Sequence, residues 1–341
     1  MIAEKSFPPL PPALRASRPS SERVARRDQV RMLVIVRAGQ SIVHSRFDRL
    51  GEFLGTGDLV VVNTSRVVPS AVAAQRAGGG LVQLRPCVRR HGWWDALAVR
   101  PAPPFENVPL EVGEQLRAGD IVFTVAGRRS DIPFLWRLHF EGDDGLDMLL
   151  RHGEPIRYSY VPDPVELDQY QTVYASHPGS AESPSAGLPF SWELLSGLRG
   201  SGVGLAEIVL HTGLSSYQDD KFDAEHHLYE EWFEVSPATA AAVGRARRVV
   251  AVGTTVVRAL ETAGGRDGTV RPVGGWTDLA IGDHTRLRVV DSLITGLHEP
   301  EASHFNILRA LVDPDLLQRA YGAAIESGYL WHEFGDTLLI V

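Results

Sequence analysis

Short runs of hydrophobic residues bounded by turn residues predict the first buried strands of this chain. MLVIV at 32–36 and DLVVVN at 58–63 are the first two such runs. The segment that precedes them, up to about Gln29, is rich in Pro, Ser and Arg, and we expect it to lie on the surface as irregular chain.

The pattern changes between about Ala71 and Arg157, where short alternating runs are separated by Gly, Pro and Asp. Such runs are typical of a small antiparallel barrel or sandwich. GGG at 78–80 and GEQLRAGD at 113–120 predict hairpin connections. The runs themselves are LVQLRPCV (81–88), WWDALAV (93–99), DIVFTVAG (120–127) and FLWRLHF (134–140).

After Tyr160 the chain alternates between strand and helix patterns. Ser191 is a plausible N-cap for a helix over 191–200, and Ser236 before a proline predicts another helix start. This alternation implies an α/β layer with a mainly parallel sheet, in which ligands gather at the carboxyl ends of the strands. The predicted strands are 204–213, 248–253 and 287–296, and the predicted helices are 191–200, 236–248, 254–265, 301–312 and 314–328.

The two textures together predict an α/β catalytic domain made from both ends of the chain, with a β-barrel domain inserted between them. We place the α/β domain at residues 1–70 and 158–341 and the inserted barrel at residues 71–157. No internal repeat of 20 to 50 residues is present, so solenoids and propellers are excluded.

Composition narrows the protein class further. The 341 residues are 44% hydrophobic, enough for a sizeable core, and Cys87 is the only cysteine, which excludes a disulfide framework and a cysteine-rich metal site. The chain shows neither a secretory signal nor a membrane-spanning run, so we expect a cytoplasmic protein.

Charge argues against a generic nucleic-acid binder. The formal net charge is −8, whereas such proteins are usually basic. A local cluster of six arginines lies between Arg15 and Arg31, and a solvated surface arm is the favoured interpretation over a basic binding face.

Polar residues follow four of the predicted strands. Asn63, Thr64 and Arg66 follow the second strand, and His211 ends a later one. Gly253, Thr254 and Thr255 begin a helix, where free amides suit a carboxylate or a ribose hydroxyl. Asp291 and His298 accompany the last strand region. Each group alone has an ordinary explanation as turn or cap residues, and no dinucleotide fingerprint, phosphate loop or zinc pattern is present.

These segments resemble one family, the S-adenosylmethionine:tRNA ribosyltransferase-isomerases of queuosine biosynthesis. The matching stretches run in the family's order and cover most of the chain; among them are GDLVVVNTSRVVPSAV (57–72), YQTVYA (170–175), SAGLPF (185–190), LHTGLSSYQ (210–218), EHHLYEEWFEV (225–235), VAVGTTVVRALET (250–262), VVDSLITGLHEPEAS (289–303) and GYLWHEFGDTLLI (328–340). The resemblance implies a barrel-like α/β domain with an inserted β-barrel.

The resemblance also implies an activity. S-adenosylmethionine is then a co-substrate that donates its ribosyl group to a 7-aminomethyl-7-deazaguanine in tRNA, with release of adenine and methionine and with no prosthetic group or metal. Because the sulfonium acidifies the neighbouring 5′-carbon, this chemistry needs a positioned base, polar groups for the ribose hydroxyls and a dry pocket.

Site residues are carried over from the family motifs. The resemblance implies that His211, His226 and His298 transfer protons, since imidazole titrates near neutral pH, and that Arg258 is a further catalytic residue. It implies substrate-binding roles for Asn63, Thr64, Arg66, Tyr170, Gln171, Tyr174, Ala186, Gly187, Gly213, Gln218, Glu231, Gly253, Thr254, Thr255 and Asp291.

Four departures from the family pattern leave the acceptor open. Pro189 stands where the family has His, Tyr229 where it has a second His, Gly296 where it has Asn, and Glu299 where it has Leu. In addition to these four, the loop LHTGLSSY at 210–217 stands where the family has Leu-His-Val-Gly-x-Gly-Thr-Phe, with a glycine lost and hydroxyls added. The alternative is a divergent enzyme that uses S-adenosylmethionine on a small-molecule acceptor, or in an elimination or isomerisation, without tRNA. A binding protein that kept the fold and lost the chemistry is a third possibility, and the retained His211, Arg258 and His298 argue against it.

Overall fold

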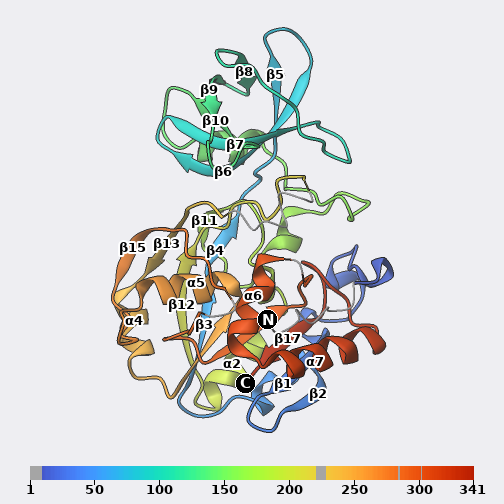
Figure 1. The fold of residues 1–341 in the computed structure, drawn as a ribbon, viewed down its shortest axis with the longest axis vertical. Helices are drawn as coiled ribbons and strands as arrows, with labels where there is room; N and C mark the ends of the chain where they lie inside the picture. Colours follow the sequence, from blue (N-terminus) through green and yellow to red (C-terminus); the bar gives the residue numbers. More distant parts are fainter. Residues whose placement is uncertain (1–9, 220–227, 283–284, 301) are drawn as a thin grey trace, which may run out of the picture.

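A β-barrel and a larger α/β body make up the molecule (Figure 1). This computed structural model describes residues 10–219, 228–282, 285–300 and 302–341. The chain enters the barrel after β4 (Ser65–Val67) and returns to the α/β body before β11 (His177–Ser180), with which β4 pairs in parallel. The α/β class with an inserted barrel is therefore confirmed.

The α/β body is built on one sheet with nine strands among the described residues, in the order β15-β13-β12-β3-β14-β16-β17-β1-β2. Its four central strands β12, β3, β14 and β16 are parallel. Of the other pairs, β17 and β1 are parallel, whereas β15 and β13, β13 and β12, β16 and β17, and β1 and β2 are antiparallel. The sheet is therefore mixed, and the expectation of a mainly parallel sheet is corrected. The strands are β1 (Arg31–Val36), β2 (Ser41–Arg46), β3 (Asp58–Asn63), β12 (Gly204–Leu210), β13 (Glu231–Val235), β14 (Arg248–Val252), β15 (Val273–Thr277), β16 (Ser292–Gly296) and β17 (Thr337–Ile340).

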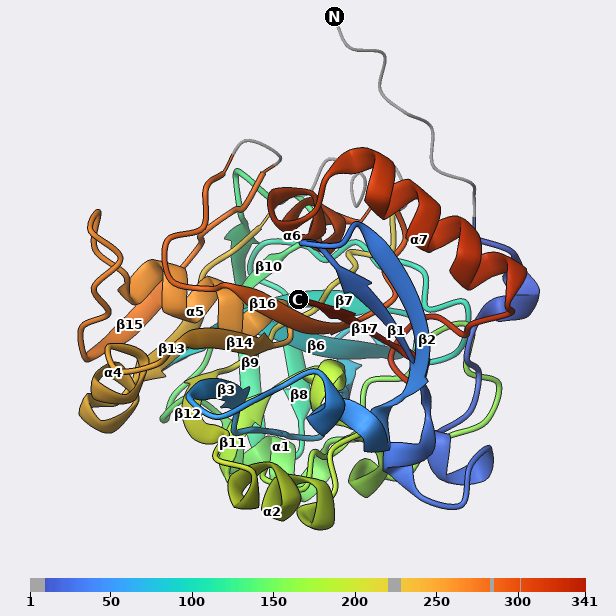
Figure 2. The same cartoon turned by 90° about the horizontal axis from the view of Figure 1, so that it is seen from below.

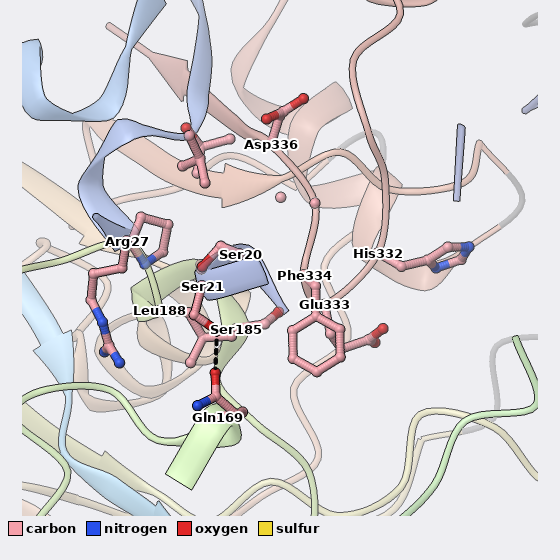
Figure 3. A pocket seen from close by; sticks show the side chains of 16 residues that line it. Ser20, Ser21, Arg27, Gln169, Ser185, Leu188, His332, Glu333, Phe334 and Asp336 are labelled. Carbon is pink, nitrogen blue, oxygen red and sulfur yellow. Dashed lines mark hydrogen bonds between the residues drawn. The ribbon is translucent and has the colours of Figure 1, made fainter. Parts of the chain in front are cut away.

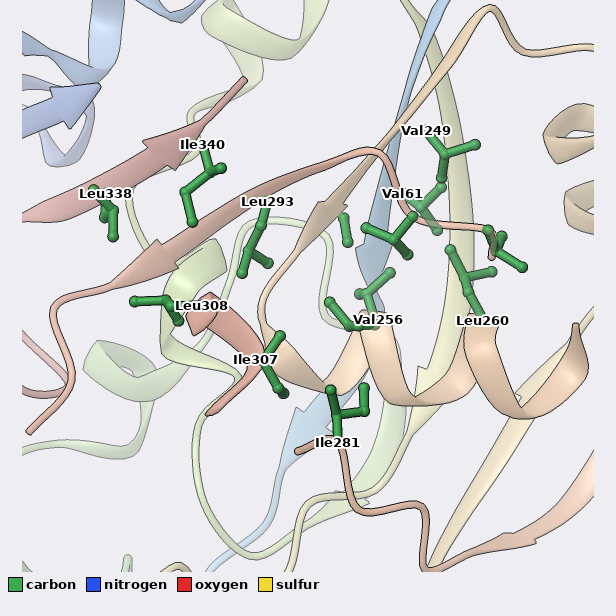
Figure 4. Close-up of a cluster of buried hydrophobic side chains, with 14 of the residues drawn as sticks. Val61, Val249, Val256, Leu260, Ile281, Leu293, Ile307, Leu308, Leu338 and Ile340 are labelled. Carbon is green, nitrogen blue, oxygen red and sulfur yellow. The ribbon is translucent and has the colours of Figure 1, made fainter. Parts of the chain in front are cut away.

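Both faces of the central sheet are buried. All six residues of β3 are buried, with Val61 packed in one hydrophobic cluster and Val60 in the other. A continuous apolar run is what a strand covered on both faces requires, which explains why DLVVVN predicts it so well. Figure 4 shows Val61 and Val249 of the sheet facing Val256 and Leu260 of the helix that covers them.

Helices cover the two faces unequally (Figure 2). Four of them bury apolar residues against one face, whereas α2 packs on the other. The predicted N-caps are confirmed, since Ser191 accepts from the amide of Leu194 and Ser236 from that of Thr239, each at 3.1 Å. No described helix is long and apolar enough to cross a membrane. The helices are α1 (Leu146–His152), α2 (Trp192–Gly200), α4 (Pro237–Val243), α5 (Thr254–Ala263), α6 (Ser303–Leu311) and α7 (Pro314–Glu326).

The barrel is closed and its strands pair antiparallel, in the order β10-β7-β6-β5-β8-β9. Trp94 and Phe123 pack at its centre with ring centroids 4.7 Å apart. The segment 113–120, predicted as a hairpin connection, instead contains a strand of its own, β8. The barrel strands are β5 (Val72–Arg76), β6 (Leu81–Arg90), β7 (Trp93–Val99), β8 (Gln115–Ala118), β9 (Ile121–Arg128) and β10 (Trp136–His139).

The arginine-rich N-terminal segment is held by the C-terminal one. The amide of Ala16 donates to the carbonyl of Trp331 at 3.1 Å, Arg23 donates to the carbonyl of Phe334, and Arg31 forms an ion pair with Asp336 at 2.8 Å. The expectation of a solvated arm is therefore wrong for Arg23 and Arg31, whose guanidinium groups bind this C-terminal chain.

Candidate active site

The carboxyl ends of the four central parallel strands meet at one edge of the sheet, on the side that faces the barrel. Asn63 ends β3, His211 follows β12, Gly253 follows β14 and Gly296 ends β16. The polar residues that follow these strands therefore lie along one edge of the sheet. Asp291 is the exception, because it precedes β16 and accepts from the amide of Val249 at 2.8 Å, which places it at the opposite, amino edge.

A cleft of about 260 Å³ separates the barrel from the carboxyl edge of the sheet. Residues of both bodies line it, so neither body forms it alone. The barrel side contributes Pro86, Cys87, Arg89 and Asp144, and the sheet side contributes Gly179, Ala181, His211, Thr212, Glu230, Glu231, Trp232 and Trp276.

His211 is the histidine of this cleft. Its Nδ1 lies 2.8 Å from the hydroxyl of Ser65, and its ring stacks on Trp232 with centroids 5.3 Å apart. Burial, together with the positive charge of Arg89 and the neighbouring His177, lowers the pKa of His211 to about 4. The prediction that this imidazole titrates near neutral pH is therefore wrong.

Glu231 lines the cleft and is paired with Arg258. Arg258 donates to one carboxylate oxygen of Glu231, and the other oxygen accepts from the amide of Gly213 at 2.8 Å. Arg258 also donates to the carbonyl of Leu279 at 3.0 Å. Both side chains are only 12% exposed, so the pair fixes the glycine loop after β12.

The polar groups of β3 and α5 hold the strand ends to one another. The side chain of Asn63 donates to the carbonyl of Leu210 at 2.8 Å and accepts from the amide of the same residue at 3.0 Å. It also donates to Thr255 at 3.4 Å, and Thr64 donates to the carbonyl of Ile208 at 3.2 Å. Thr254 is buried behind Gly253, whose φ of 88° favours glycine.

Arg66 differs from these residues because its side chain is exposed. It has no hydrogen-bond or ion-pair partner in the part of the chain that the structure describes. Its guanidinium is therefore available to an anionic ligand where β4 leaves the carboxyl edge of the sheet. Gln218 has a φ of 59°, and its backbone amide donates to the hydroxyl oxygen of Ser216 at 3.0 Å. The loop that carries it is tied to the barrel, because Asn107 donates to the carbonyl of Tyr217 at 2.8 Å.

The segment 170–175 is bonded to β4, which follows the carboxyl edge of the sheet. Gln171 donates to the carbonyl of Val67 at 2.9 Å and accepts from its amide at 3.0 Å, so the side chain replaces a missing strand partner. Tyr170 is buried in a neighbouring apolar cluster, and burial raises its pKa to about 12. Tyr174 stands against the 185–190 loop, where a Cβ on Gly187 would lie 2.2 Å from the Tyr174 hydroxyl.

The 185–190 loop closes the other half of the carboxyl edge, near β16. A Cβ built on Gly253 would lie 3.4 Å from the Cβ of Ala186, so the loop rests on the strand end. The pocket between the loop, the N-terminal segment and residues 332–337 measures about 40 Å³ (Figure 3). Ser20, Ser21 and Glu333 are among the residues that line it. We call it the closed pocket.

Three of the four departures from the family pattern gather at the closed pocket. Pro189 and Gly296 line it, and Glu299 bonds to Arg15 at 3.3 Å and lies 3.5 Å from His332, which also lines it. The fourth, Tyr229, is buried below the glycine loop and donates to the carbonyl of Leu214 at 2.9 Å.

His298 lies near the closed pocket and away from the cleft. Two strands separate β12 from β16, so the strand ends that precede His211 and His298 are roughly 14 Å apart. Its Nε2 lies 2.7 Å from the hydroxyl of Thr295, its ring stacks on His304, and burial lowers its pKa well below the usual value. His226 lies outside the described residues.

The structure adds site residues that sequence patterns do not reveal. Arg89 lies near the end of the barrel strand β6, and nothing in its local sequence indicates that it faces a histidine from another body. Glu182 follows the cleft residue Ala181 and accepts from the amide of Ser215 at 3.2 Å; burial raises its pKa to about 7. No group of three or more potential metal ligands occurs among the residues placed by the structure.

Known proteins resemble this chain along its whole length. The family model described as "Queuosine biosynthesis protein" matches residues 6–340. The S-adenosylmethionine:tRNA ribosyltransferase-isomerases of Moorella thermoacetica and Symbiobacterium thermophilum are 36% and 37% identical to it, each over 97% of both chains. The solved S-adenosylmethionine tRNA ribosyltransferase of Thermotoga maritima superposes with a TM-score of 0.55 at 29% identity, covering 98% of this chain and 99% of that one. The chain therefore belongs to the queuosine biosynthesis protein family, that of the S-adenosylmethionine:tRNA ribosyltransferase-isomerases.

Proposed function

We propose that this protein transfers and isomerises the ribosyl group of S-adenosylmethionine onto a 7-aminomethyl-7-deazaguanine in tRNA, releasing adenine and methionine. The observation that carries the proposal is the full-length match to enzymes of that name, which includes both the barrel and the sheet and hence the cleft between them. A cytoplasmic location, expected from the single cysteine, agrees with tRNA as the acceptor.

We assign the reacting part of S-adenosylmethionine to the cleft. Its walls come from two bodies and carry a partly buried imidazole, a guanidinium and two tryptophans, a combination that supplies donors to oxygen atoms. The exposed Arg66 at the same edge suits a tRNA phosphate, because guanidinium groups bind phosphate in a bidentate manner.

The other residues that the family resemblance implies fall into two groups, those bonded to neighbouring protein groups and those near the closed pocket. Asn63, Gln171, Glu231 and Arg258 are engaged with neighbouring protein groups, so we propose that they position the edge. We keep His298, Ala186 and Gly187 as candidates on the side of the closed pocket, where a ligand would have to displace the loop or the N-terminal segment.

One observation favours the alternative acceptor. The departures Pro189 and Gly296 line the closed pocket and Glu299 lies beside its lining residue His332, so the half of the edge away from the barrel differs from the family pattern. Changed side chains around the pocket that closes this half are what a small-molecule acceptor in place of tRNA would require, although Tyr229 lies on the cleft side.

The release of adenine and methionine tests the proposal. The protein is incubated with S-adenosylmethionine alone, with tRNA that carries the deazaguanine base, and with the same tRNA lacking it. Release only with the modified tRNA supports the proposal, and equal release in all three mixtures supports the alternative. Saturable binding of S-adenosylmethionine without release in any mixture would overturn both.

A further inference from the structure

A chain of buried hydroxyl groups ends on the imidazole of the cleft. The amide of Thr212 donates to the hydroxyl oxygen of Ser180 at 3.0 Å. That hydroxyl lies 2.6 Å from the hydroxyl of Ser65, which lies 2.8 Å from Nδ1 of His211. Ser180 is 0% exposed and Ser65 is 1% exposed, so neither hydroxyl is in contact with bulk water.

The direction of the two hydroxyl bonds follows from counting donors and acceptors. The Ser180 oxygen already accepts from Thr212, and the only acceptor for its own proton among the described residues is the oxygen of Ser65. The proton of Ser65 then has one acceptor left, Nδ1 of His211. The reverse direction would leave a buried hydroxyl proton without an acceptor, which folded proteins avoid.

We propose that Ser180 and Ser65 hold His211 in the neutral tautomer with its proton on Nε2, so that His211 donates a hydrogen bond to an oxygen atom of the substrate instead of acting as the base. The Nε2 atom has no partner among the described residues and is not among the buried unpaired atoms, so it faces the cleft that the ring lines. The identity of the acceptor rests on the proposed function; the tautomer does not.

The surroundings of the ring fit a fixed, neutral donor. The ring is stacked on Trp232, and a Cβ on Gly179 would lie 2.4 Å from the ring, so a side chain there would displace it. Burial and the charge of Arg89 hold the pKa of His211 low, which keeps the imidazole neutral at neutral pH. The charged and titratable groups that line the cleft with it are Cys87, Arg89 and Asp144 on the barrel side and Glu230 and Glu231 at β13. His177 on β11 is a further neighbour of the ring.

Nitrogen NMR of the ring tests the tautomer directly in the free protein. Full-length protein labelled with ¹⁵N-histidine is compared with a His211→Gln variant, whose missing signals assign this one ring among the twelve histidines. We expect a single tautomer with protonated Nε2. A signal from protonated Nδ1 would overturn the proposal whether or not the protein has the proposed activity.

Ser65→Ala tests the positioning role. Without the donor on Nδ1, protonation of that atom becomes easier, so the pKa of His211 should rise towards its ordinary value and turnover should fall about tenfold, the equivalent of one hydrogen bond. Ser292→Ala is the matched control, because it removes another buried serine hydroxyl of the same body and should leave the titration unchanged. An unchanged titration in Ser65→Ala would contradict the assigned direction.

His211→Gln and His211→Ala separate a donor from a base. The glutamine amide can donate a hydrogen bond but cannot accept a proton at neutral pH, so it should retain turnover within about tenfold, whereas alanine should lose at least about a hundredfold. Equal loss in both variants would overturn the donor role. Absence of turnover in the wild type would count against the proposed function and leave the NMR result standing.

Discussion

The two halves of the carboxyl edge are covered in different ways. Over β12 and β13 the barrel leaves a cleft of about 260 Å³, whereas over β16 the 185–190 loop, the segment 20–30 and residues 332–337 leave about 40 Å³. The barrel meets the sheet through side chains such as Arg90, which lies 3.4 Å from the ring centroid of Trp276. The N-terminal segment is instead bonded by its backbone to Trp331. The barrel and the sheet are therefore separated by the length of side chains, whereas the N-terminal and C-terminal segments are in direct backbone contact.

Breaking an ion pair on each side should give the largest difference. Arg258→Met leaves Glu231 charged and nearly buried, so the free energy of unfolding should fall by about 3 kcal/mol. Arg15→Met removes the half-exposed pair with Glu299 on the closed side and should cost less than about 1 kcal/mol. Urea unfolding of both variants measures this, and equal losses would show that the two sides are held alike.

The free energy of unfolding should change with pH in opposite directions for one buried group on each side, His211 at the cleft and Glu333 at the closed pocket. The folded pKa of His211 lies below its unfolded value, so the stability that neutral His211 contributes is present above about pH 6.5 and is lost as pH falls towards 4. His211→Gln removes this loss and should retain about 2 kcal/mol more of its neutral-pH stability at pH 4 than the wild type does.

The stability contribution of Glu333, at the closed pocket, depends on pH in the opposite direction. Burial raises its pKa to about 7, so the folded state is favoured below about pH 4.5 and weakened as pH rises through 7. Glu333→Gln should therefore gain stability relative to the wild type above pH 7. Thermal unfolding across pH 4 to 8 checks both variants, and a shift of the same sign in the two would refute the contrast.

Arg89 should affect binding more than stability. Its guanidinium lines the cleft and donates to the carbonyl of Gly179 at 3.1 Å, so Arg89→Gln removes a positive charge beside the ligand. We expect the KM for S-adenosylmethionine to rise about tenfold with little change in kcat, equivalent to one charged hydrogen bond. Ser20→Ala, in the closed pocket, is the control and should leave the KM unchanged.

The smallest effect is expected where the barrel touches the sheet edge. Arg90→Ala removes a cation–π contact with Trp276 and a long ion pair with Glu230 at 3.9 Å, worth about 0.5–1 kcal/mol at a partly exposed site. Cleavage by a protease in the segments that join the barrel to the sheet should become faster. An unchanged rate would mean that the remaining contacts hold the barrel without Arg90.

Strands with strong local patterns were predictable. DLVVVN (58–63) and WWDALAV (93–99) coincide with β3 and β7, because both faces of β3 are buried and the turn residues around each run are clear. β2 and β13 were not predicted, since β2 has one strand neighbour and is largely exposed, and β13 is short and follows a polar segment. A strand was predicted over 287–296, but only Ser292–Gly296 forms β16.

The sequence alone determined the polar residues at four strand ends and the family to which the chain belongs, because local patterns and motif order are properties of the linear chain. It did not determine that Asp291 lies at the opposite edge or that Glu231 forms an ion pair with Arg258. Nor did it determine that Ser65, Ser180 and Arg89 lie around His211. Those relations join residues separated by up to about 150 positions, and only strand order and the docking of the barrel bring them together. The burial that lowers the pKa of His211 arises in the same way, so its protonation state is a property of the tertiary structure.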